Sequence, residues 1–156
     1  MKRRTFLQGT VASGAIAVAA GAGLLKPGQA LAAGAWSNAA FDAEDIAGSA
    51  SALFGDAKVA DSGDIKIKAP LQAENGAVVP LKIETSIADV ENISIFVAEN
   101  PRPLATSVAL GPGAMGYYST RVKMGKTSDI ITYVKAKGGL FQAKAMVKVT
   151  VGGCGG

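Results

Sequence analysis

The sequence predicts a mainly β protein: an immunoglobulin-like antiparallel β-sandwich of about seven strands, with one N-terminal amphipathic helix and a flexible C-terminal arm. Three observations lead to this prediction. Apolar residues recur with helical spacing over about residues 37–54 and with a period of two in the runs that follow. Turn signals separate these runs at intervals of roughly 8–12 residues, which is typical of a sandwich. The chain then ends in Gly-Gly-Cys-Gly-Gly.

Residues 1–32 have the features of an export signal. Arg3-Arg4 is followed by Phe6-Leu7, a glycine-rich apolar stretch of about 15 residues and Ala-x-Ala sites. This pattern is typical of a twin-arginine signal, with an ordinary Sec signal as the alternative, and both lead to the periplasm. We expect cleavage between Ala32 and Trp36. The apolar stretch is too short for a bilayer core of ~30 Å, so no membrane anchor is expected.

The charge balance depends on this segment. Residues 1–32 hold four of the 16 basic residues and none of the 12 acidic ones, so the remainder is formally neutral. The sequence pI of about 9.3 is therefore no evidence for binding to nucleic acid or membrane. The chain has no histidine, which excludes a Ser-His-Asp triad, a Cys-His pair and the common zinc sites as built from this chain alone.

The region after the signal, residues 33–151, is predicted to fold as one domain that begins with a helix over about 37–54. Ser37 or Asn38 can cap its start, and Gly55 fits its end. Three carboxylates lie near the positive end of the helix dipole, which favours this role over a metal site: Asp42, Glu44 and Asp45.

Alternating apolar residues predict the strands, at residues 64–70, 77–85, 91–99, 104–110, 117–124, 128–137 and 140–151. Pro80 predicts an edge or a bulge at its position. Residues 137–139, Lys-Gly-Gly, predict a hairpin turn. The last run places six apolar side chains on one face, which predicts a long strand with one side buried.

Four aromatic residues lie opposite the inward-facing positions of these strands: Phe96, Tyr117, Tyr118 and Tyr133. They could form an interface patch, or they could be covered by a second core layer or a helix. The sequence alone leaves both alternatives open.

Residues 152–156 are the candidate functional segment. Cys154, the only cysteine, is the candidate attachment site, and the glycines around it would give the arm flexibility and access to a narrow channel: Gly152, Gly153, Gly155 and Gly156. A lone cysteine in an oxidising compartment indicates intermolecular pairing or a reactive thiol. No basic side chain in the tail activates this thiol, so we expect a carried nucleophile rather than a catalytic residue.

Other interpretations of the tail remain. Cys154 could tether an exported, non-catalytic β-sandwich module to a partner by a disulfide, or it could be an incidental residue of a flexible terminus. A ubiquitin-like carrier would load its terminal carboxylate, but the export signal and the strands disfavour that fold. The cysteine is third from the end, which does not fit a C-a-a-X lipidation site.

The chain resembles the SoxY family, the sulfur-carrier subunits of the periplasmic Sox thiosulfate-oxidising system. The resemblance rests on four segments: VGGCGG at 151–156, APLQAENGAVVPLKIET at 69–85, NPRPLA at 100–105 and STRVKMGKTSDI at 119–130. Arg102 stands where an asparagine is expected, and Gly125 where an alanine is expected. Both are turn positions, so neither departure weakens the resemblance much.

The resemblance implies a division of labour among proteins. A Sox cytochrome would couple thiosulfate to Cys154, a hydrolase would release sulfate and leave a persulfide, and a sulfane dehydrogenase would oxidise the outer sulfur. SoxZ would be the heterodimer partner, and the folded pair would be exported together. The resemblance also implies that this chain has no cofactor, no metal and no catalytic residue of its own.

Overall fold

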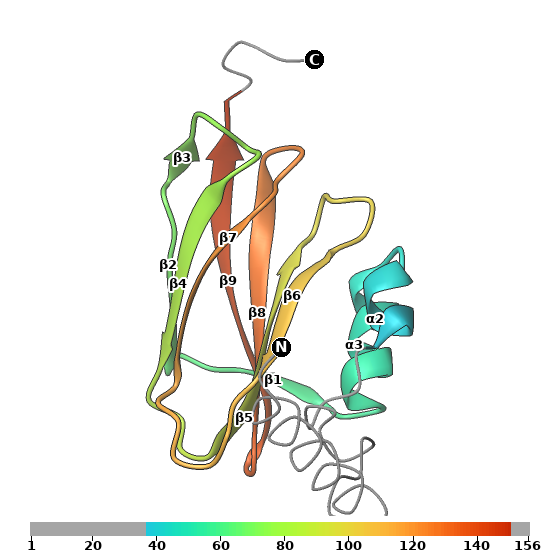
Figure 1. Ribbon diagram of the computed structural model, residues 1–156, viewed down its shortest axis with the longest axis vertical. Helices are drawn as coiled ribbons and strands as arrows, with labels where there is room; N and C mark the ends of the chain where they lie inside the picture. Colours follow the sequence, from blue (N-terminus) through green and yellow to red (C-terminus); the bar gives the residue numbers. More distant parts are fainter. Residues whose placement is uncertain (1–36, 151–156) are drawn as a thin grey trace, which may run out of the picture. The chain divides into compact units, whose positions relative to one another are not determined.

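The computed structural model describes residues 37–150, which form two facing β-sheets with helices over one outer face (Figure 1). The larger sheet has the order β1-β9-β8-β5-β6, with β3 also paired to β9, and the smaller sheet has the order β2-β4-β7. The elements are α2 (Asn38–Asp42), α3 (Ile46–Phe54), β1 (Val59–Asp61), β2 (Ile65–Lys68), β3 (Gln72–Ala73), β4 (Val79–Thr85), β5 (Val90–Val97), β6 (Leu104–Ala109), β7 (Tyr117–Val122), β8 (Ser128–Ala136) and β9 (Gly139–Val149).

The seven strands expected from the alternating pattern are all present, as β2 and β4 to β9. Two further strands, β1 and β3, were not predicted, and both pair in parallel with β9. The sequence predicted an antiparallel sandwich, and this prediction is wrong for β1 and β3, which make the larger sheet mixed. With three and two residues, β1 and β3 are too short to show a period. Their backbone groups instead take up hydrogen bonds along the free edge of the long strand β9.

The single helix predicted over residues 37–54 is wrong in one respect, because the chain forms two helices. Ser37 caps α2 as expected, but Ala43 is extended and ends it. Asp45 then caps α3, with its carboxylate accepting a hydrogen bond from the Gly48 amide. A side chain that satisfies free amides at a helix start favours a new start over an unbroken helix. Gly55, with φ of 65°, ends α3 as predicted.

The main core lies between the two sheets. Leu81 and Ile83 of the smaller sheet face Ile95 and Val147 of the larger one, and all four are at most 1% exposed. The inward face predicted for the last strand is confirmed for Phe141, Ala143, Val147 and Val149, which all pack in this core. Full burial of one such side chain contributes roughly 1.5–3 kcal/mol, so the alternating pattern fixes which face of each strand turns inward.

A second core lies under the helices, and it shows which of the four aromatic residues are buried. Phe96 and Tyr133 are buried there with ring centroids 4.9 Å apart, beneath Phe54 of α3. Tyr118 packs against the main core, and its hydroxyl lies 3.0 Å from Thr106 Oγ1. Tyr117 alone is exposed, at 46%. Helix cover therefore holds for two of the four, and they form no common interface patch.

The prediction at Pro80 is correct locally, although β4 is the middle strand of its sheet. The pairing of β2 with β4 ends at Lys82, so only β7 pairs with β4 at Pro80. A residue without an amide donor is tolerated where one side of the strand has no neighbour. Among the helices of residues 37–150, none is long and apolar enough to cross a bilayer.

Candidate functional site

The predicted site residues lie beyond the last residue that the structure describes, Thr150. These are Cys154 and its flanking glycines, Gly152, Gly153, Gly155 and Gly156. What the structure does show is the end of the sandwich from which that tail continues, at the C-terminus of β9 (Figure 1).

The last residues of β9 are held on both sides. Towards β3, the Thr150 amide donates to the Ala73 carbonyl at 3.0 Å, and the Lys148 amide donates to the Leu71 carbonyl at 3.1 Å. On the other side, the Thr127 hydroxyl accepts from the Val149 amide at 3.0 Å. The backbone that leads into the cysteine segment is thus fixed up to Thr150.

Gly76 packs tightly against this end of β9. Its carbonyl accepts a hydrogen bond from the Met124 amide at 2.7 Å, and the Met124 side chain is only 2% exposed. A Cβ at position 76 would lie 2.9 Å from Val149 Cγ1 and closer still to the Met124 carbonyl oxygen. Only glycine lets these three segments approach so closely.

Asn100 joins two further loops at the same end. Its Nδ2 donates to the Lys123 carbonyl at 2.8 Å, and its Oδ1 accepts from the Gly125 amide at 3.1 Å. The turn at residues 100–103 is therefore clamped to the loop between β7 and β8. We call this hydrogen-bonded end of the sandwich the arm base, and it is made of Ala73, Gly76, Asn100, Met124, Thr127 and Val149.

The arm base collects three of the segments that carried the resemblance drawn from the sequence, around residues 74–80, 100–103 and 119–130. The sequence did not predict that these segments meet, that Gly76 and Thr127 contact the end of β9, or that Asn100 holds the neighbouring loop between β7 and β8. The sequence does indicate that Gly76, Asn100 and Thr127 each lie in a turn between two predicted strands. Which turns share an end of a sandwich depends on strand order, which periodicity does not reveal.

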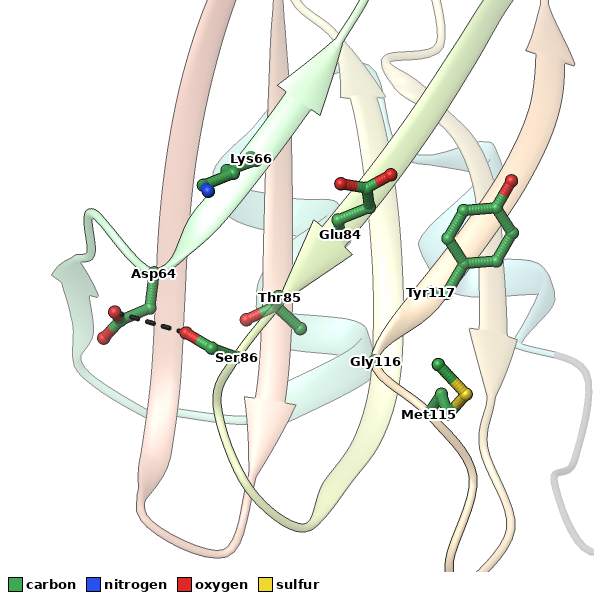
Figure 2. Close-up of a pocket in the computed structure, with 8 residues that line it drawn as sticks. All are labelled: Asp64, Lys66, Glu84, Thr85, Ser86, Met115, Gly116 and Tyr117. Carbon is green, nitrogen blue, oxygen red and sulfur yellow. Dashed lines mark hydrogen bonds between the residues drawn. The ribbon is translucent and has the colours of Figure 1, made fainter.

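The opposite end of the smaller sheet carries a hollow of ≈ 390 Å³. β4 runs from Val79, near Gly76, to Thr85 at this hollow. Figure 2 shows its lining residues, which come from β2, β4, β7 and the adjoining loops: Asp64, Lys66, Glu84, Thr85, Ser86, Met115, Gly116 and Tyr117.

Positive charge surrounds Glu84 in this hollow. Lys68 Nζ lies 2.8 Å from Glu84 Oε1. This hydrogen bond lowers the pKa of the Glu84 carboxyl, and the charges of Lys68, Lys66 and Lys82 add to the effect. Glu84 is therefore ionised at neutral pH, but the surrounding cations outnumber it.

No group of three or more His, Cys, Asp or Glu side chains within residues 37–150 is placed to hold a metal ion. Two of the three acidic residues considered for a metal site have other roles. Asp42 pairs with Arg102 at 3.2 Å, and Asp45 caps α3.

Fold and sequence together define a β-sandwich protein whose only thiol lies on a C-terminal extension of a long strand. The chain belongs to the SoxY family: the profile of that family, described as sulfur oxidation protein SoxY, matches residues 50–154. The resemblance drawn from the sequence is thereby confirmed.

A solved structure agrees with this assignment. The sulfur carrier protein SoxY from Chlorobium limicola f thiosulfatophilum is 42% identical, with a TM-score of 0.60 over 65% of this chain and 92% of that chain. An engineered protein matches 56% of this chain and 20% of its own, at 10% identity and a TM-score of 0.40, which is too low to inform either fold or function. Comparison with curated protein sequences gives no significant match.

Proposed function

We propose that this protein is a sulfur carrier that binds thiosulfate-derived intermediates covalently on Cys154 and presents them to separate enzymes of sulfur oxidation. The observation that carries the proposal is the family match, which extends over residues 50–154 and so includes Cys154 itself. The 42% identity to a protein described as a sulfur carrier supports the same role.

The geometry of the arm base supports a carrier. Thr150 is hydrogen-bonded to Ala73, and Cys154 follows four residues later. At ~3.3–3.6 Å per residue, the cysteine can reach at most about 14 Å from Thr150. A partner's active site must therefore come to this end of the sandwich. Four glycines around Cys154 would give the arm a small cross-section and low stiffness, and the proposal therefore includes a flexible carrier arm. It also includes an immunoglobulin-like sandwich as the body that carries this arm.

The chemistry divides between this chain and its partners. In the loading step, a bond forms between the Cys154 sulfur and the outer sulfur of thiosulfate. The thiol proton is released, and two electrons pass to a cytochrome partner. Hydrolysis by a second partner then breaks the bond between that sulfur and the sulfonate group, with water supplying the oxygen of the released sulfate. A persulfide remains on Cys154 for a sulfane dehydrogenase.

The proposal includes the site of action and a permanent partner. Residues 1–32 would direct export to the periplasm through the twin-arginine route. SoxZ would form a heterodimer with this chain and travel with it as a folded pair. In this scheme the chain is not an enzyme, because the catalytic groups and redox cofactors belong to the transient partners.

Intact-mass measurement tests the proposal. The mature protein is incubated with thiosulfate and the partner cytochrome, and we expect the addition of one thiosulfate to the wild type and none to Cys154→Ser. Removal of Gly156 is the matched control, since it would abolish loading of a terminal carboxylate but not of a thiol. An unchanged mass, or an adduct that survives in Cys154→Ser, would contradict the carrier role. A stable disulfide between Cys154 and a partner protein would instead favour a tethered module.

A further inference from the structure

The outer face of the smaller sheet is unusually basic. Along β2, β4 and β7, the outward positions alternate with buried or half-buried ones. Five of these outward positions are charged, and four are cations against one anion, a net charge of +3: Lys66, Lys68, Lys82 and Arg121 against Glu84. The register places Lys66 beside Glu84 and Lys82 beside Lys68, so the charges form one continuous face.

The helical segment carries the opposite charge. Residues 37–58, which include both helices, contain four acidic residues and a single lysine, Lys58. These helices cover the outer face of the larger sheet, away from β2, β4 and β7 (Figure 1). Residues 37–150 are neutral in sum, with 12 basic and 12 acidic side chains. The excess of positive charge on the outer face of the smaller sheet is therefore local, because residues 37–150 as a whole carry no net charge.

The basic face leads to the arm base. Arg121 pairs with Pro80 near the start of β4, and Val79 and Val122 form the next pair. Gly76 and Met124, which are joined by a hydrogen bond, follow directly at the arm base. The row of Lys66 and Glu84 lies about five residues along the strand, or ~17 Å away. A partner protein bound to this face would thus lie within reach of Cys154.

The far end of the face offers apolar anchors. Met115 is 82% exposed and Tyr117 is 46% exposed, and both line the hollow of ≈ 390 Å³ (Figure 2). Tyrosine, methionine and arginine are enriched in protein interfaces, where charged residues surround such anchors. A nucleic-acid or membrane surface would call for a net basic domain, which this domain is not.

We infer that the outer face of the β2-β4-β7 sheet is a docking surface for an acidic protein surface beside the active site of a partner enzyme. The inference rests on the proposed carrier function and adds the surface by which the carrier is recognised. Attraction between the basic face and an acidic partner speeds and orients the encounter, so that the arm base meets the active site.

The test measures how fast the partner cytochrome loads thiosulfate onto Cys154 over a series of ionic strengths. The test variant is Lys82→Glu/Arg121→Glu, which changes the face from +3 to −1. The fold should tolerate both substitutions, because the register partners are Lys68 for Lys82 and Pro80 for Arg121, so neither change places two acidic residues opposite each other. The matched control is Lys58→Glu/Lys144→Glu, which makes the same change in total charge at exposed positions outside this face.

We expect the test variant to load at least ~10-fold more slowly at low ionic strength, with the difference mostly lost near ~0.5 M salt. The control should stay within about 2-fold of the wild type. A third variant, Glu84→Gln, raises the charge of the face and should load faster. It tests the docking surface even where the double variant fails to fold.

Three results would overturn the inference. One is equal loading by the test and control variants, together with no gain in Glu84→Gln. Another is a wild-type loading rate that does not change with salt. A third is that the face binds anionic vesicles, DNA or the acidic helices of a second copy, with the cytochrome rate unaffected by the variants. Absence of any adduct at every ionic strength would instead remove the carrier function, and the docking surface with it.

Discussion

Replacement of Gly76 by alanine tests how the arm base is built. The added Cβ would lie 2.9 Å from Val149 Cγ1 and even closer to the Met124 carbonyl oxygen. That carbonyl belongs to the backbone of a residue whose side chain is 2% exposed, so it cannot move aside as a flexible side chain could. The loop at residue 76 must therefore shift away from β9.

The cost has two parts. Forced overpacking of this kind costs about 1–3 kcal/mol. The shift also strains the 2.7 Å hydrogen bond from the Met124 amide to the Gly76 carbonyl, whose loss costs about 0.5–1.5 kcal/mol. We expect a total of about 2–4 kcal/mol. For a domain of this size that corresponds to a melting temperature about 10 °C lower.

Thermal and urea unfolding of the mature protein measure this loss, and two matched variants interpret it. Gly63→Ala places its Cβ where nothing lies within 4 Å, so it should be neutral or slightly stabilising. Gly116→Ala places its Cβ 2.6 Å from Thr85 Cγ2 and should destabilise at the opposite end of the sheet. Both clashing variants should unfold earlier. The loading of Cys154 should slow in Gly76→Ala but not in Thr132→Ser, which loses stability at a fully buried position of β8 and lies neither at the arm base nor at the hollow that Gly116 lines.

Two outcomes would refute this reasoning. If Gly76→Ala unfolds within ~0.5 kcal/mol of the wild type, the close approach of the three segments is not required for stability. If Gly76→Ala and Thr132→Ser slow loading equally, the effect comes from lost stability in general. The arm base would then have no special part in presenting Cys154.

Two further predictions concern buried polar groups. Thr132 is fully buried, and its hydroxyl has no hydrogen-bond partner in the part of the chain that the structure describes. In urea unfolding, Thr132→Val should therefore stabilise the protein by about 1 kcal/mol, whereas Thr132→Ser, which keeps the hydroxyl and loses the methyl, should destabilise it. A destabilised valine variant would mean that the hydroxyl is satisfied. Burial raises the pKa of the Tyr133 hydroxyl above its ordinary value near 10, so the unfolded chain loses this proton first, and the contribution of Tyr133 is complete below pH 10 and is lost as the pH rises further. Tyr133→Phe should therefore lose less stability than the wild type between pH 9 and pH 11, and equal losses in the two proteins would contradict this.

The regular strands were predictable because each shows its own alternation. Ile93 and Ile95, or Leu81 and Ile83, identify an inward face without any knowledge of what covers it. The short strands β1 and β3 were not predictable, since their pairing with β9 comes from a neighbour distant in the sequence. The break between α2 and α3 was not predictable from spacing, because Asp45 fits the first turn of one long helix as well as the cap of a second helix, which is its position here.

The aromatic residues show the same limit. The alternation correctly placed Phe96 and Tyr133 on the outer side of their strands, but it could not say whether helix or solvent lay there. Packing of α3 against the larger sheet buried both residues, while Tyr117, on the other sheet, stayed exposed. Burial of an outward residue depends on a partner that the strand itself does not specify.

The sequence by itself determined the family, the seven principal strands and the position of the only thiol on the C-terminal segment. These follow from local patterns, in which each residue is compared with neighbours a few positions away. Only the tertiary structure decided that Gly76 and Thr127 meet at the end of β9, that Asn100 holds the neighbouring loop between β7 and β8, and that four cations share the outer face of the smaller sheet. The reason is that such proximity depends on which strands pair and in what order, and the free energy that selects the order comes from burial between segments far apart in the chain.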